Sequence, residues 1–150
     1  MSDFLTIYHI VPSIGISSTT GESGVTTWTY AQLNGIDNVA EALNEVIQQY
    51  QFLEHKGFAR NHVTGAAPAW TLSGRRLIGD PAQDYIASVK YGLDTQRQSS
   101  FKLEYTIGEI NYSLTVPCTL CNIQDIAGGA STDDSVFSVE VRFDGQPTIA

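Results

Sequence analysis

The sequence predicts a mainly β protein with a single α-helix. Apolar and polar residues alternate over several segments of seven or eight residues, two of these segments form a self-consistent hairpin, and one further segment has helical spacing. The chain has 150 residues, the size of one ordinary domain, and 42% of them are hydrophobic, as in a globular protein. We therefore expect one folded domain.

A small polar stretch precedes the first clear strand of the sequence. Residues 12–24 are mostly small polar residues and turn formers, which predicts a flexible N-terminal arm over residues 1–25 and a folded domain over residues 26–150. The first expected strand is 26–33, with Trp28 and Tyr30 on one face, and the next is 69–75.

Residues 36–53 fit two patterns. Six apolar residues fit a helix: Ile36, Val39, Leu43, Val46, Ile47 and Tyr50. Val46, Tyr50 and Phe52 fit a strand less tidily. The pattern alone favours the helix.

The clearest helix begins after Asp80. Asp80 is a typical N-cap residue, Pro81 suits the first helical position, and Gln83 completes a capping-box pattern. An apolar stripe follows at helical spacing, and Gly92 is placed to end the helix. The stripe is Ala82, Ile86, Val89 and Leu93. We expect it to lie on a sheet.

The expected hairpin joins segments 101–107 and 110–116 through the two-residue turn Gly108-Glu109, which suits a type II′ turn. In this register every apolar residue faces an apolar partner, so we expect one face of the hairpin to be buried and the other to be exposed to solvent. The pairs are Ile107 with Ile110, Tyr105 with Tyr112, Leu103 with Leu114 and Phe101 with Val116. A last strand is expected over 136–143, after an exposed, flexible loop over 127–135.

The charge of the chain excludes several functions. A net charge of −8 and a pI near 4.6 exclude an ordinary basic nucleic-acid-binding protein and a polybasic membrane anchor. No run reaches the ~18 apolar residues of a membrane span, and no secretory signal is recognisable, so we expect synthesis in a cytoplasm.

The charges are unevenly distributed along the chain. Residues 1–55 carry no Lys or Arg, whereas residues 56–102 are basic. This segregation suggests complementary subunit contacts, unless folding mixes the charges over the surface.

We expect no enzyme activity, no metal and no cofactor. Cys118 and Cys121 lie three apart on an expected strand and point to opposite faces, which favours buried free thiols over a metal or redox pair. Arg75 and Arg76 could hold a phosphate, although a salt bridge at a subunit contact is favoured. Trp28 and Trp70 could stack on a sugar, although such residues are more often in a core or an interface.

Four segments together resemble the major tail protein, the tail tube subunit, of long-tailed bacteriophages with non-contractile tails. They are 33–38 (LNGIDN), 63–65 (VTG), 72–86 (LSGRRLIGDPAQDYI) and 139–147 (VEVRFDGQP). Their order and spacing carry the resemblance, which covers residues 26–147.

The resemblance implies a β-sandwich or barrel of two packed antiparallel sheets with one flanking helix. It further implies rings of six copies that stack into a hollow tail tube in the virion, assembled in the host cytoplasm. Double-stranded DNA would pass through the lumen without specific binding, and tape-measure and tail terminator or baseplate proteins would be partners. For the ambiguous segment it implies a loop over 35–45 and a strand over 46–53, which we adopt instead of the helix.

The candidate contacts between subunits are charged. We expect an acidic loop and the arm to meet basic residues of a neighbouring ring, and the candidates are Asp37, Glu41, Glu45, Lys56, Arg60, Arg75 and Arg76. We also expect the surface that faces the lumen to be neutral or acidic. The alternatives are a tube of a phage-tail-like bacteriocin, a carbohydrate-binding β-sandwich that uses Trp28 and Trp70, and a small enzyme with a concealed site.

Overall fold

The computed structural model describes residues 4–150 and is mainly β, with two antiparallel sheets and one helix, as the sequence predicts. The strands are β1 (Val11–Thr20), β2 (Thr26–Gln32), β3 (Ile36–Ala42), β4 (Val46–Tyr50), β5 (Arg60–Gly65), β6 (Ala69–Arg75), β7 (Gln98–Ile107), β8 (Ile110–Gln124), β9 (Val136–Phe143) and β10 (Thr148–Ile149). The helix is α1 (Pro81–Ser88), and the short 3₁₀ turns are η1 (Ile7–His9), η2 (Leu53–His55) and η3 (Asp94–Arg97).

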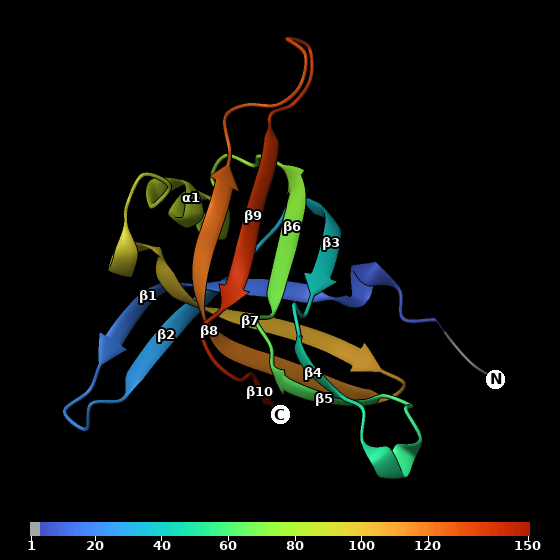
Figure 1. Cartoon of the computed structure of the whole chain (residues 1–150). Coiled ribbons are helices and arrows are strands. Elements are labelled where there is room, and N and C mark those ends of the chain that lie inside the picture. The colour runs from blue at the N-terminus through green and yellow to red at the C-terminus, as the bar shows by residue number, and fades with distance from the viewer. Residues whose placement is uncertain (1–3) are drawn as a thin grey trace.

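The larger sheet has the strand order β2-β1-β7-β8-β9-β6-β3, and β10 adds to β8. The 15-residue strand β8 links the two halves of this sheet, because it pairs with β7 on one side and with β9 on the other. Figure 1 shows β9, β6 and β3 running across β1 and β7. β4 and β5 form the second, two-stranded sheet.

The core contains the apolar side chains that alternate along the central strands. Its fully buried members include Ile14, Leu72, Phe101, Val116, Phe137, Val139 and Val141. Helix α1 buries Ala82 and Ile86 in the same cluster and contacts β1, β2 and β8. Burial of a large apolar side chain stabilises the fold by about 1.5–3 kcal/mol, so this cluster is the main source of stability.

The register of the predicted hairpin is confirmed pair by pair, but its apolar face is not buried throughout, because Ile107 and Ile110 at the tip are exposed. β7 and β8 place Ile107 opposite Ile110 and Tyr105 opposite Tyr112, and the two tyrosine rings stack with centroids 5.4 Å apart. Two expected strands are confirmed with their bounds, β6 at Ala69–Arg75 and β9 at Val136–Phe143. The strand expected over 26–33 is confirmed as β2.

The predicted start of the helix is confirmed, but the helix is shorter than the pattern indicates. The Asp80 carboxylate accepts the Gln83 backbone N–H at 3.2 Å, and Pro81 is the first helical residue. The helix ends at Ser88, so Leu93 lies outside it and is exposed. Leu93 therefore does not belong to the buried stripe.

The flexible arm predicted for residues 1–25 is wrong over β1, and residues 1–3 lie outside the described residues. β1 pairs with both β2 and β7 and fully buries Ile14, so no domain boundary separates it from the residues after 25. Its small residues serve close packing: a Cβ on Gly15 would lie 2.7 Å from the ring of Trp28. The residues that suggested a turn therefore allow two strands to approach.

The segment 36–53 is not the helix of the pattern, and only the strand of the loop and strand that we adopted is confirmed. The strand expected over 46–53 is confirmed as β4 (Val46–Tyr50), but the loop expected over 35–45 is wrong because residues 36–42 form β3. A register shift between Ile36 and Asn38 explains the misleading pattern. The extra residue places Ile36 and Val39, three apart, both in partly buried positions, which imitates helical spacing.

Candidate assembly surface

The hairpin formed by β4 and β5 projects from one end of the molecule (Figure 1). The two strands pack against each other and against no other element to a comparable extent. Many of its large apolar side chains are nevertheless exposed, with Leu53 96% exposed and Phe58 78% exposed. The others are Val46, Ile47, Tyr50, Phe52 and Val63. A concentration of exposed apolar side chains on one element marks an interaction surface.

The tip of the hairpin has a defined shape. The rings of Tyr50 and Phe52 stack with centroids 5.6 Å apart, and His55 lies edge-on to Phe52 at 6.1 Å. The η2 turn ends at Lys56, whose φ of 54° reverses the chain toward β5. The aromatic side chains at the tip therefore contact one another within the subunit, whereas Leu53 and Phe58 remain exposed.

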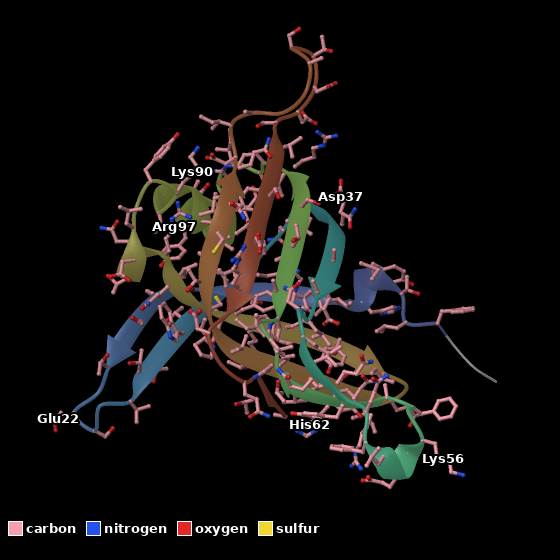
Figure 2. The ribbon with its side chains drawn as sticks, viewed as in Figure 1. Glu22, Asp37, Lys56, His62, Lys90 and Arg97 are labelled. Carbon is pink, nitrogen blue, oxygen red and sulfur yellow. The ribbon has the colours of Figure 1, made fainter. Side chains whose placement is uncertain are left out.

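Five of the predicted contact residues are exposed and carry unpaired charges. Within residues 4–150, no ion pair involves Asp37, Glu41, Glu45, Lys56 or Arg60. Asp37 and Glu41 lie on β3, at the edge of the larger sheet, and Lys56 lies at the end of the hairpin (Figure 2). These charges are available to another molecule, although the structure of one chain does not bring them together.

The two arginines at the end of β6 differ. Arg76 donates to Asp84 at 2.8 Å, so its charge has a partner within the subunit. The Arg75 side chain is exposed and, among residues 4–150, donates only to the backbone oxygen of Asp134 at 3.1 Å, so its charge is not paired there with a carboxylate. Both arginines remain candidates for a contact between subunits, and Arg75 is the one whose charge has no partner in the described chain.

The charges on the central strands neutralise each other along single strands. Lys102 lies 3.3 Å from Glu104 on β7, and Arg142 donates to Glu140 at 2.7 Å on β9. The hydrogen bonds that Glu140 accepts from Arg142 and Asn122 lower the pKa of its carboxyl group. Both strands therefore present paired rather than free charges.

The cysteines and tryptophans do not form the sites considered from the sequence. Cys118 is a buried free thiol, as expected, and burial raises its pKa to about 12, so it is protonated at neutral pH. Cys121 is half-buried, and its pKa is also raised by burial. Trp70 is buried with its ring centroid 6.1 Å from that of Phe101, which removes it as a platform for a sugar. Among the residues described, no three His, Cys, Asp or Glu side chains are grouped to hold a metal ion.

A groove of about 860 Å³ lies between the link from α1 to β7 and the end of β8. Tyr91, 85% exposed, and Leu93, 80% exposed, lie along it together with the exposed Ile126. The sequence does not reveal this groove, because Leu93 fits the spacing of the apolar stripe of the helix. No motif in the sequence indicates that the helix ends at Ser88, before Leu93.

The chain was also compared with known proteins. No protein-family model and no curated protein sequence matches it. Solved structures do match, and the three below are 11–14% identical to this chain and are aligned over almost the whole of it.

The chain is similar to a chain in the tail of a gene transfer agent particle, with a TM-score of 0.68 and 11% identity over 98% of this chain and 99% of that chain. It is also similar to a chain of the sheath-tube complex of an extracellular contractile injection system (PVC), with a TM-score of 0.60 and 13% identity over 98% and 91%. A third similar chain comes from the tube-terminating cap of the anti-feeding prophage, with a TM-score of 0.62 and 14% identity over 100% and 93%.

These likenesses show the fold and confirm the tail-tube type predicted from the sequence. The similar chains come from a contractile system as well as from a gene transfer agent, so the fold does not single out the non-contractile tails of the sequence resemblance. None of the helices in the part of the chain that the structure describes is long and apolar enough to cross a membrane.

Proposed function

We propose that this protein is a structural tube subunit, which self-assembles head to tail into rings of six that stack into a hollow tube. The observation that carries the proposal is the projecting β4–β5 hairpin, whose apolar side chains nothing in the described chain covers. The tail-tube fold supports it over the whole length of the chain. Six-fold symmetry is stated for the gene transfer agent tail and for the anti-feeding prophage baseplate, which supports six copies a ring.

If the hairpin of one subunit meets a different surface of the next copy, the contact is heterologous. Repetition of such contacts closes into a ring or extends along an axis. Burial of the exposed apolar side chains on a second copy supplies the driving force, because removal of apolar surface from water is favourable in association as in folding.

Charge complementarity adds to this contact. The acidic residues Asp37, Glu41 and Glu45 lie exposed on and after β3, and we assign Arg60 and Arg75 of a neighbouring copy as their partners. Exposed charge pairs are weak and are screened by salt, so they set the orientation of the subunits more than the affinity.

The first prediction is that the purified protein associates with rising concentration, because the exposed apolar side chains of the hairpin are buried on a second copy. Sedimentation velocity should show species larger than the monomer. The double variant L53D/F58D should remain monomeric with unchanged β-type circular dichroism, because both side chains are exposed in the free subunit. Wild-type protein that stays monomeric at millimolar concentration and low salt would contradict the proposal.

We further propose that the lumen of the tube lets double-stranded DNA pass without holding it. A cation on a phosphate adds salt-dependent affinity, which would oppose sliding. The ion pairs Lys102–Glu104 and Glu140–Arg142 leave little free positive charge on β7 and β9, and the chain has a net charge of −8.

The second prediction follows from these pairs. Wild-type protein should show no DNA binding in a fluorescence anisotropy titration at ordinary salt, whereas E104Q/E140Q, which frees Lys102 and Arg142, should bind measurably more DNA. Tight binding of DNA by the wild-type protein would contradict the proposed role of the lumen.

The likeness to chains of two injection systems supports a second version of the same function, a tube of a phage-tail-like bacteriocin or injection system. In both versions the protein is located in a phage-like particle after synthesis in the host cytoplasm. Proteins of the tube terminator or baseplate type and a tape-measure protein are the proposed partners. The genes beside this one distinguish the versions, since sheath genes would accompany a contractile system.

A further inference from the structure

The groove between the α1–β7 link and β8 has a floor held by hydrogen bonds and an ion pair. Arg97 donates to the backbone oxygens of Gly92 and Leu120, each at 3.0 Å, and to that of Lys90. The Lys90 ammonium group is paired with the buried carboxylate of Asp125. The Arg97 and Lys90 side chains therefore already have partners within the chain. Their contacts hold the link between α1 and β7 against β8.

The rim of the groove has exposed apolar side chains and a carboxylate without an ion-pair partner in the described chain. Tyr91, Leu93 and Ile126 expose apolar surface there, and the Asp94 carboxylate takes part in no ion pair among residues 4–150. A matching partner therefore has apolar side chains and a free positive charge close together.

We propose that this groove receives the tip of the β4–β5 hairpin from a second copy of the chain. The inference rests on the proposed function, because it names the surface that the hairpin contacts. Leu53 and Phe58 cover the apolar rim of the groove, and Lys56, between them in sequence, pairs with Asp94. Lys56 therefore forms its ion pair with Asp94 of the second copy. Arg60 and Arg75 remain the proposed partners of the acidic residues on and after β3.

The positions of the two surfaces require two copies. Lys56 at the hairpin tip and Lys90 and Arg97 at the groove lie at opposite ends of the molecule (Figure 2). One chain cannot fill its own groove without unfolding, and each copy presents one tip and one groove. The contact is therefore head to tail and repeats from copy to copy.

Another apolar cavity, of about 320 Å³, suits the tip less well. Leu5 and Ile7 of the same chain line it together with Trp70 and Leu103. These N-terminal side chains already cover part of its apolar surface, and Glu41 is the only charged residue among the described residues that line it. The groove beside α1 leaves more apolar surface uncovered.

A pair of introduced cysteines tests the contact in the full chain. L53C and Y91C are combined with C121S, because Cys121 lines the groove, and the protein is mildly oxidised under conditions in which it associates. Each copy then carries both cysteines, so we expect a ladder of disulfide-linked oligomers on a non-reducing gel. The matched control pairs L53C with I107C, whose side chain is also exposed but lies at the tip of the β7–β8 hairpin, and should give no ladder.

The possible results distinguish a failure of the groove contact from a failure of the proposed tube-subunit function. Association without the 53–91 ladder, whether or not the control gives one, overturns the groove as the receiving site and leaves the tube subunit standing. Wild-type protein that never associates overturns both. Equal ladders from both pairs overturn the groove as well, since they report random collision. A mixture of L53C and Y91C single variants in the C121S background should give only linked dimers.

Discussion

Replacement of Gly74 by alanine should lower the free energy of unfolding by about 3 kcal/mol or more, at the upper end of the cost of overpacking. An alanine Cβ at this position would lie 2.0 Å from the backbone oxygen of Gly35 and 2.8 Å from the Cα of Ile36. Neither atom can move away easily, because Gly74 lies in β6 between β3 and β9, paired with Ile36 and Phe137. The substitution must therefore push β3 away from the sheet.

Chemical denaturation of G74A and wild type measures this loss. G145A is the matched control, because its added Cβ would lie 3.7 Å from Pro117, an ordinary contact distance, and its backbone needs no left-handed conformation. We expect the control to stay within about 0.5 kcal/mol of wild type, as for most surface substitutions. A G74A protein as stable as G145A would show that β3 does not lie against β6 in the described register.

Replacement of Gln83 by alanine should cost a similar amount, about 3–5 kcal/mol, since it leaves a cavity and several unpaired polar groups. Gln83 is 0% exposed and joins three segments. Its amide nitrogen donates to the backbone oxygens of Asn34 at 2.6 Å and Arg75 at 3.0 Å, and its oxygen accepts the Leu77 N–H at 2.7 Å. No neighbouring side chain can replace all three hydrogen bonds.

Thermal or chemical unfolding of Q83A tests this role, with Q98A as the control because Gln98 is exposed and forms no side-chain hydrogen bond in the described structure. Q83L distinguishes hydrogen bonding from packing. It nearly restores the volume but not the hydrogen bonds, so we expect it to be almost as unstable as Q83A. A Q83L protein as stable as wild type would assign Gln83 a packing role only.

Local signals in the sequence predict those elements whose contacts are made with residues nearby in the sequence. The register of β7 and β8 follows from alternation on both strands and a two-residue turn, and the helix start follows from Asp80 and Pro81. Each of these signals lies within a few residues of the structure that it specifies. The strand pairs between distant segments, such as β6 with β9, have no such signal.

The failures have physical causes in particular residues. β1 contains Gly15 because Trp28 lies over it, and a single sequence does not reveal that contact. The register shift in β3 made Ile36 and Val39 imitate a helix. Leu53 and Phe58 are not among the predicted contact residues, yet nothing in the described chain covers them. A residue whose partner lies in another molecule cannot be distinguished from a core residue by its type.

The most direct test of the proposed function is electron microscopy of the purified protein as its concentration is raised at low salt. Tubes or stacked rings with a central channel and six-fold symmetry are the expected result, and L53D/F58D should give none. Isolated subunits at every concentration, in a preparation that circular dichroism shows to be folded, would contradict the proposal that this chain builds a tube.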